Sequence, residues 1–178
     1  MGLQPLIKLD RKYILGTYGR YPLILTRGDG CYVWDEQGKK YLDFFSGISV
    51  NNFGHQHPKI TKAINQQIKR FNHVSNWYYT KPQAILAEKI IKKSMPGWKV
   101  FFSNTGAEAN ECAIKVARKW GAGRYEIITF KNSFHGRTMA TISATGQEKV
   151  QHGFEPLLPG FKYAEFNNLN SVKSLITA

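Results

Sequence analysis

The clearest alternation of apolar and polar positions lies between residues 98 and 121. Residues 98–102 are mostly apolar and follow Pro96 and Gly97, a pattern that predicts a buried strand. Further along, apolar residues recur at three- and four-residue spacing until Gly121, which predicts an amphipathic helix with a glycine stop. The residues with this spacing are Ala109, Ala113, Val116, Ala117 and Trp120.

The small residues at positions 103–110, Ser-Asn-Thr-Gly-Ala-Glu-Ala-Asn, join that strand to that helix. A strand, a tight turn and a helix in this order aim unpaired backbone N–H groups and the positive end of the helix dipole at one point. Such a point suits a phosphate. Alternatively, Gly106 serves only as the turn residue of an ordinary α/β unit. This stretch by itself does not decide between the two interpretations.

The first third of the chain has a different pattern. Apolar and aromatic runs separated by glycine turns over residues 21–45 predict a small antiparallel meander, and residues 1–18 predict an arm with a short helical piece. Residues 46–58 are too rich in glycine and asparagine for a regular element and predict a loop. Helices are expected to open at Pro58 and at Pro82.

A second apolar run, at residues 125–130, predicts a further strand. The order strand, helix, strand implies that residues 98–102 and 125–130 form a parallel pair with a right-handed crossover. Ligands lie beyond the carboxyl ends of such strands, so the loops at residues 103–106 and 131–138 should face one pocket. The later elements expected in this α/β fold are a short helix at 138–144, a strand at 161–166 and a helix capped by Asn170.

The formal net charge of +13 makes nucleic acid a rival partner. The 25 lysines and arginines are spread over several elements without a dense basic tract, so we expect no nucleic-acid binding. No apolar run approaches the roughly 20 residues of a membrane helix, and residues 1–12 lack the apolar core of a secretory signal. We therefore expect no membrane contact and a cytoplasmic location. His55 and His57 have no third metal ligand close by, so we expect no metal site.

The loop at residues 131–138 carries two side chains with distinctive chemistry. Phe134 offers a flat apolar face, and Arg137 offers a planar, permanently charged fork that suits a carboxylate. Beside a phosphate-binding turn, this pair describes a site for an aromatic phosphorylated cofactor and an acidic substrate. The alternative is that Phe134 lies in the core and Arg137 forms a surface ion pair.

Five stretches together carry a family resemblance: residues 38–44, 46–48, 54–58, 104–111 and 133–138. In that order and spacing, the chain from about Tyr18 onward resembles the first half of the class III, pyridoxal-phosphate-dependent aminotransferases. The resemblance implies an incomplete fold type I transferase, with an N-terminal meander and helix and the first part of a mostly parallel sheet. It also implies that residues 1–72 belong to the small domain and that residues 73–178 begin the large, cofactor-binding domain.

The resemblance assigns roles to individual positions. The residues implied to hold the phosphate of pyridoxal 5'-phosphate, mainly through backbone N–H groups, are Thr105, Gly106 and Ala107. Phe134 is implied to stack on the pyridine ring of the cofactor. Arg137 is implied to bind the α-carboxylate of the substrate, and Tyr18 to line the same pocket.

Within this family the chain resembles most the acetylornithine aminotransferases, on residues 72–79 and 158–161. Ornithine aminotransferases tend to carry tyrosine where this chain has Ile48 and tryptophan where it has His135. The implied reaction moves the δ-amino group of N2-acetylornithine to 2-oxoglutarate, in arginine biosynthesis, and the implied complete enzyme is a cytoplasmic homodimer. One alternative is an ornithine or 4-aminobutyrate aminotransferase. Another, of a different class, is a non-catalytic basic module that binds nucleic acid or a full-length subunit.

The catalytic residues of the family are expected to lie outside this sequence. The Schiff-base lysine, the acidic residue that pairs with the pyridine nitrogen and the C-terminal domain would all follow residue 178. We therefore expect the sequence to be the N-terminal portion of a longer enzyme, with no catalytic residue of its own. Because transamination needs that lysine as a proton carrier, this portion should be inactive alone.

Overall fold

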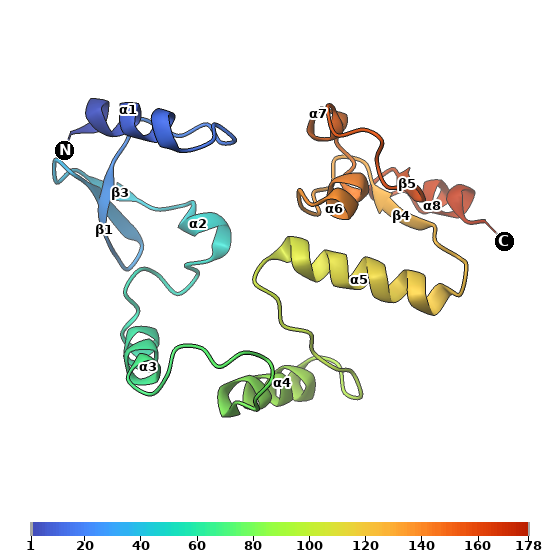
Figure 1. Cartoon of the computed structure of the whole chain (residues 1–178), viewed down its shortest axis with the longest axis horizontal. Coiled ribbons are helices and arrows are strands. Elements are labelled where there is room, and N and C mark those ends of the chain that lie inside the picture. Colours follow the sequence, from blue (N-terminus) through green and yellow to red (C-terminus); the bar gives the residue numbers. More distant parts are fainter. Residues whose placement is uncertain (1, 178) are drawn as a thin grey trace. The chain divides into compact units, whose positions relative to one another are not determined.

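The computed structural model describes residues 2–177. It divides into two compact units, Met1–Tyr79 and Thr80–Ala178, called here the N-terminal unit and the C-terminal unit (Figure 1). The domain boundary expected from the family resemblance lies between residues 72 and 73 instead. That domain assignment stays a prediction.

The N-terminal unit contains a small antiparallel sheet. Its elements are α1 (Leu3–Tyr13), β1 (Leu25–Asp29), β2 (Tyr32–Asp35), β3 (Lys40–Leu42), α2 (Ser46–Ser49) and α3 (Pro58–Ile68). The strand order β1-β2-β3, antiparallel throughout, confirms the predicted meander. Helix α3 begins at Pro58 as expected, because the fixed φ of proline and its missing N–H suit a first helical turn.

A buried carboxylate closes the turn between β2 and β3. Asp35 accepts hydrogen bonds from the backbone N–H groups of Gln37 and Lys39 and from the hydroxyl of Tyr41, each at 2.9 Å. Burial raises the pKa of Asp35, but the hydrogen bond from Tyr41 and the two N–H groups together hold it below its ordinary value. The carboxylate therefore stays charged and fully bonded inside the sheet.

Residues 46–49 differ from the predicted loop. They form the short helical turn α2, whose four residues have φ between +42° and +65°, in the left-handed region. The carboxylate of Asp43 supports its start, because it accepts the N–H groups of Phe45 at 3.0 Å and Ser46 at 2.8 Å. The other oxygen of Asp43 is hydrogen-bonded to Nε2 of His55 at 2.8 Å. Two local hydrogen bonds and one from further along the chain therefore hold a backbone shape that composition does not predict.

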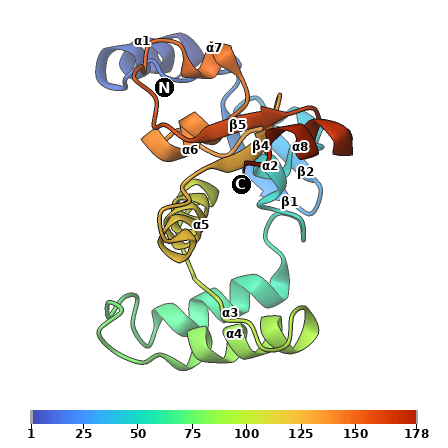
Figure 2. The ribbon, with the colours of Figure 1, turned by 90° about the vertical axis from the view of Figure 1, so that its right-hand side faces the viewer.

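The C-terminal unit is built on a parallel strand pair flanked by helices. Its elements are α4 (Lys81–Lys93), α5 (Gly106–Gly121), β4 (Ile127–Phe130), α6 (Met139–Ala144), α7 (Glu148–Gln151), β5 (Phe161–Ala164) and α8 (Leu169–Leu175). Strands β4 and β5 pair in parallel, and Figure 2 shows them side by side with α8 next to β5. The strands predicted at 125–130 and 161–166 and the short helix predicted at 138–144 are confirmed.

The core of this unit lies between α5, α6 and the strand pair. Ile114 of α5 is buried against Ala140 and Ala144 of α6, and Ile127, Leu158 and Phe161 pack around them. The small residues of α6 allow the two helices to approach closely. This packing fixes where the first turn of α5 lies relative to the loop that precedes α6.

The prediction of a strand at residues 98–102 is wrong. These residues belong to no strand of the structure, and the side chains of Trp98 and Phe101 are 66% and 62% exposed. Their predicted parallel partner, residues 125–130, pairs instead with β5. A strand needs a neighbour for its N–H and C=O groups, and no segment within residues 2–177 pairs with 98–102.

The last helix also begins earlier than predicted. Its N-cap is Asn168, whose side-chain oxygen accepts the N–H of Ser171 at 3.1 Å, and not Asn170.

Among the described residues no helix is long and apolar enough to cross a membrane. Within the same residues no group of three or more His, Cys, Asp and Glu is placed to hold a metal ion.

Candidate functional site

The first turn of α5 presents two open backbone donors. Thr105 is the N-cap, and its hydroxyl accepts the N–H of Glu108 at 3.1 Å. The carboxylate of Glu108 turns back to accept the backbone and side-chain N–H groups of Asn104, at 2.6 and 3.1 Å. Within residues 2–177, the N–H groups of Gly106 and Ala107 have no acceptor. The capping bonds therefore leave the N–H groups of Gly106 and Ala107 for an incoming anion.

The start of α5 is open to solvent. Thr105 and Gly106 are exposed, and a Cβ added to Gly106 would meet no atom within 4 Å. Helix α5 has 16 residues, so its N-terminus carries the partial positive charge of a well-formed helix dipole. This arrangement fits a phosphate group held by backbone N–H groups.

The loop at residues 131–138 leaves the carboxyl end of β4 and is tied to the end of α6. The N–H of Asn132 donates to the carbonyl of Gly146 at 2.7 Å, and the N–H of Ser133 donates to that of Phe130 at 3.2 Å. Only glycine fits at position 146, because a Cβ there would lie 2.2 Å from the carbonyl oxygen of Phe130. The start of the loop is therefore fixed.

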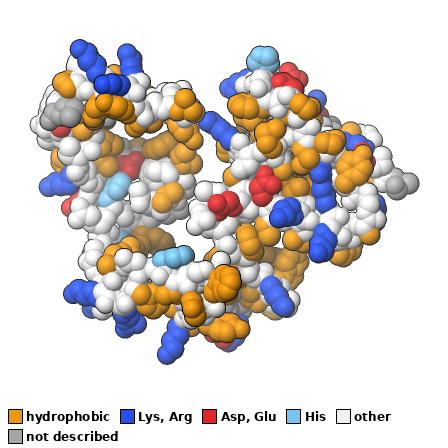
Figure 3. All heavy atoms as spheres, in the orientation of Figure 1, with side chains coloured by type: hydrophobic (Ala, Val, Ile, Leu, Met, Phe, Trp, Pro, Cys, Tyr) orange, Lys and Arg blue, Asp and Glu red, His pale blue; other side chains and the backbone are white. Residues whose placement is uncertain are grey.

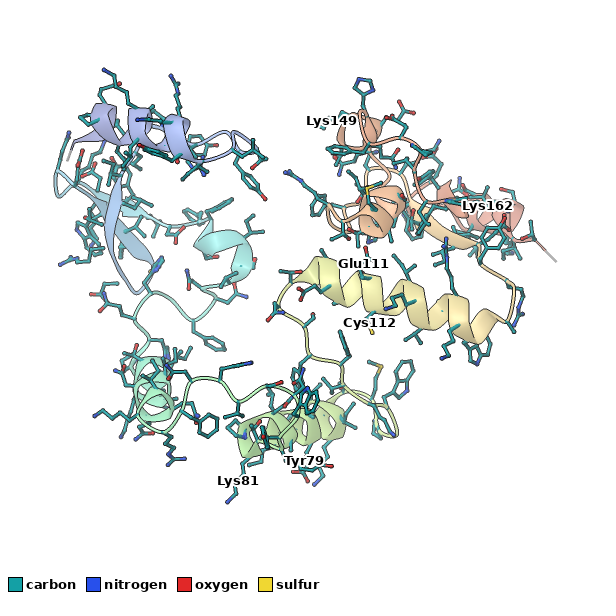
Figure 4. The ribbon with its side chains drawn as sticks, in the orientation of Figure 1. Tyr79, Lys81, Glu111, Cys112, Lys149 and Lys162 are labelled. Atoms are coloured by element: carbon teal, nitrogen blue, oxygen red, sulfur yellow. The ribbon has the colours of Figure 1, made fainter. Side chains whose placement is uncertain are left out.

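The second half of the same loop lies on the first turns of α5. The side-chain amide of Asn110 donates to the carbonyl of His135 at 2.9 Å. Gly136 has φ +136°, and a Cβ there would lie 2.7 Å from the Cβ of Ala107. The hydroxyl of Thr138 donates to the carboxylate of Glu111, which Figure 4 shows on the side of α5 that faces α6. The loop and the helix start therefore form one surface.

Most of the predicted site residues come together at this surface. Thr105, Gly106 and Ala107 form the helix start, and Phe134 and Arg137 flank the contact of Gly136 with Ala107. Phe134 is 58% exposed and Arg137 is exposed, so neither is part of the core.

The route by which the loops meet differs from the predicted one. Two neighbouring strand ends were expected to bring the loops together, whereas in the structure the packing of α5 on α6 does so. Tyr18 belongs to the N-terminal unit, and its role in the pocket stays a prediction.

Sequence reasoning missed the residues that hold the loop in place. Thr145 is fully buried, and its hydroxyl accepts the N–H of His135 at 3.0 Å and donates to the carbonyl of Thr141 at 2.9 Å. Asn110 holds the carbonyl of the same histidine. One sequence signal could have indicated Asn110. Asparagine disfavours the interior of a helix, so its presence there suggests a polar contact that compensates for that cost.

A cavity of about 280 Å³ lies beneath the loop, between α5 and the strand pair. Its lining is mostly apolar, with polar groups from Asn110, Thr129 and His135. Nε2 of His135 and the hydroxyl of Thr129 are buried there and have no hydrogen-bond partner within residues 2–177. The cavity lies on the core side of the loop, whereas Phe134 and Arg137 are exposed.

Basic side chains are scattered over the surface. On the face shown in Figure 3, Lys and Arg lie over both units, between apolar and uncharged residues. The loop at residues 131–138 contributes Lys131, which is paired with Glu165 at 2.5 Å, and Arg137. The loop therefore carries two cationic side chains, beside the carboxylates of Glu108 and Glu111 in the first turns of α5.

Comparison with known proteins identifies what this arrangement resembles. The family model described as aminotransferase class-III matches residues 15–176. Among curated relatives, the acetylornithine aminotransferase of Caldanaerobacter subterraneus subsp. tengcongensis is 51% identical over 172 residues, which are 94% of this chain and 44% of the relative. The chain thus spans less than half the length of this relative.

Solved structures of aminotransferases share the fold. The ornithine aminotransferase from Toxoplasma gondii ME49 aligns with a TM-score of 0.91 at 26% identity, over 98% of this chain and 42% of that one. The taurine:2-oxoglutarate aminotransferase from Bifidobacterium kashiwanohense, solved in complex with PLP and glutamate, aligns with a TM-score of 0.83 at 29% identity. That alignment covers 99% of this chain and 40% of the other.

Proposed function

The chain belongs to the class-III aminotransferase family, and we propose that it forms the phosphate- and substrate-binding part of a pyridoxal-phosphate-dependent transaminase. The observation that carries the proposal is the contact between the loop at 131–138 and the start of α5. It brings the open N-terminus of α5, the exposed ring of Phe134 and the exposed residue Arg137 onto one surface. A phosphorylated aromatic cofactor and a carboxylate substrate need these three groups together.

The residues present fit this cofactor. The N–H groups of Gly106 and Ala107, at the positive end of α5, would hold its phosphate, and the capping hydroxyl of Thr105 keeps that first turn in shape. The exposed ring of Phe134 would cover one face of the pyridine ring. When bound, pyridoxal phosphate supplies the electron sink for amino-group transfer.

Arg137 would orient the substrate. Its planar guanidinium can accept a carboxylate through two parallel N–H donors, which fixes both the position and the rotation of the acid. Gly136 holds the preceding backbone against Ala107, so the arginine starts from a fixed point beside the phosphate site. In this proposal Tyr18 of the N-terminal unit lines the same pocket.

We favour N2-acetylornithine as the amine donor and 2-oxoglutarate as the acceptor, in arginine biosynthesis. Sequence identity near 50% to acetylornithine aminotransferases supports this choice over ornithine, because the ornithine aminotransferase neighbour shares the fold but only 26% identity. Ile48 and His135 also favour this choice, because ornithine aminotransferases tend to carry tyrosine and tryptophan at these two positions. The remaining parts of the proposal are a cytoplasmic homodimer for the complete enzyme and no activity for residues 1–178 alone.

Amine-donor competition tests this proposal. The native protein that contains this chain is purified with pyridoxal phosphate, and its kcat/KM is measured with N2-acetylornithine and with free ornithine against 2-oxoglutarate. We expect a preference for the acetylated donor, and a preference for free ornithine or 4-aminobutyrate would overturn the substrate assignment. Failure to retain the cofactor would overturn the whole proposal.

A variant pair tests the role of the arginine. Arg137→Lys keeps the charge but loses the two-pronged fork, so the KM for 2-oxoglutarate should rise about tenfold or more while the cofactor is retained. Arg70→Lys, at an exposed position of the N-terminal unit, is the matched control and should change nothing. Equal kinetics for both variants would show that Arg137 does not bind the substrate.

A further inference from the structure

We propose that Asn110 is a positioning residue that fixes the loop carrying Phe134 and Arg137 to the phosphate-binding start of α5. The inference deepens the proposed function and rests on it for the identity of the ligands. Asn110 touches neither ligand in this proposal. It acts through the loop.

The hydrogen bond of Asn110 falls at the centre of the loop. Its side-chain amide donates to the carbonyl oxygen of His135 at 2.9 Å, and that carbonyl belongs to the peptide group between His135 and Gly136. Phe134 and Arg137 are the residues on either side of this pair. A single bond from α5 therefore fixes the backbone midway between the ring and the guanidinium.

The two polar backbone groups of His135 are held by two different helices. Its N–H donates to the hydroxyl of Thr145 at the end of α6, at 3.0 Å, and its carbonyl accepts from Asn110 in α5. Without the asparagine amide the loop would stay hydrogen-bonded to Thr145 at the end of α6, but α5 would no longer donate a hydrogen bond to this carbonyl. The phosphate donors lie on α5, so the geometry between the phosphate site and the loop would loosen.

Other contacts between α5 and the loop do not replace this bond. Gly136 touches Ala107 only through packing, and the hydrogen bond from Thr138 to Glu111 lies at the start of α6, beyond Arg137. The carbonyl of His135 is half-buried, so loss of its donor would leave an acceptor poorly served by water. Local opening of the loop would let water donate a hydrogen bond to this carbonyl.

Asn110→Asp is the sharpest test, because the two side chains have the same size but the carboxylate cannot donate. Asn110→Ala, which removes the amide without adding charge, is the second variant. Asn170→Asp is the matched control, since it places the same new charge at an exposed position near the start of α8. All variants are made in the native protein that contains this chain.

The first readout needs no cofactor. Amide hydrogen exchange of the apoprotein is followed by mass spectrometry on peptides that cover residues 132–140. We expect both Asn110 variants to exchange about tenfold faster there, the factor set by loss of one ordinary hydrogen bond, while peptides from β4 and β5 are unchanged. The Asn170 variant should match the parent protein in every peptide.

The second readout is kinetic. Because Arg137 would contact the carboxylate and not the reacting atoms, a displaced loop should raise the KM for 2-oxoglutarate about tenfold with kcat within about threefold of the parent value. The dissociation constant of pyridoxal phosphate should rise as well. A fall in thermal midpoint without a change in exchange, KM or cofactor affinity would overturn the inference, because Asn110 would then be a purely structural residue.

The two proposals fail in different ways. If the parent protein binds pyridoxal phosphate but does not transaminate N2-acetylornithine, the substrate assignment fails, and hydrogen exchange and cofactor affinity still decide the role of Asn110. If the parent protein transaminates as proposed and the Asn110→Asp variant equals the Asn170→Asp control in every readout, only the positioning role is refuted.

Discussion

Replacing Gly136 with alanine should separate the loop at 131–138 from α5. A Cβ at this position would lie 2.5 Å from the hydroxyl oxygen of Thr141 and 2.7 Å from the Cβ of Ala107. Thr141 is fully buried in α6 and Ala107 lies in the first turn of α5, so neither can move without shifting its helix. The backbone also has φ +136°, which side chains of L-residues rarely adopt.

The expected cost has two parts. A non-glycine residue held in such a backbone conformation costs about 1–3 kcal/mol. Overpacking against fixed neighbours adds about 1–3 kcal/mol more, so Gly136→Ala should lower the free energy of unfolding by about 2–6 kcal/mol. Gly153→Ala separates the two parts, because Gly153 has φ +89° but nothing within 4 Å of an added Cβ. It should show only the backbone cost.

Urea unfolding of the native protein and of both variants measures this difference, and absorbance after gel filtration measures how much pyridoxal phosphate each retains. Gly136→Ala should unfold at lower urea than Gly153→Ala and should lose cofactor, because the proposed phosphate donors of α5 and the loop that carries Phe134 would no longer meet. Equal midpoints and equal cofactor retention for the two variants would refute the contact between Gly136 and α5.

The core and the caps give further expectations. Ile114→Ala should lower the free energy of unfolding by about 2–4 kcal/mol, because it opens a cavity among α5, α6 and the strands. Val116 lies on the same helix but is 62% exposed, so Val116→Ala should lower it by less than about 0.5 kcal/mol in the same urea titration. Thr105→Ala removes the N-cap acceptor and should cost about 1 kcal/mol, and an unchanged midpoint would mean that the cap does not contribute. The hydrogen bond to His55 and the backbone N–H groups lower the pKa of Asp43. Its stabilisation should therefore be complete above the ordinary carboxyl pKa of about 3.9 and should fade as pH falls through the lower folded value. Unfolding midpoints measured against pH should lose that dependence in Asp43→Asn, and an identical acid profile in the variant would contradict the assignment.

Local signals predicted the helices and short strands well. Prolines at the first turns of α3 and α4 and the apolar spacing of α5 act within a few residues, so sequence suffices to place them. The failed strand depended on a distant partner. Residues 98–102 have the composition of a strand, yet pairing decides whether a strand forms, and β4 takes β5 as its partner. The left-handed turn at 46–49 depends on the nearby carboxylate of Asp43 and on the bond of that carboxylate to His55, further along the chain.

Part of the geometry of the candidate site follows from sequence. The small residues before the helix predicted its turn, and in the structure Thr105 caps α5 there, ahead of the open N–H groups. The supporting residues did not follow from sequence. Asn110 and Thr145 act on a backbone 25 and 10 positions away along the chain, and nothing local indicates which carbonyl or N–H each will meet.

The packing of α5 on α6 explains how two loops can share a site without belonging to neighbouring strands. Ile114 fits against Ala140 and Ala144, which brings the start of α5 beside the loop that leads into α6. The glycine at 136 and the amide of Asn110 then turn this proximity into a defined contact. Because the first turn of one helix would hold the phosphate and the entry loop of the other would hold the ring and the carboxylate, the interface between the two helices sets the spacing of the site. Changes in that interface should therefore alter ligand binding before they abolish the fold, since the strand pair is held together by hydrogen bonds of its own.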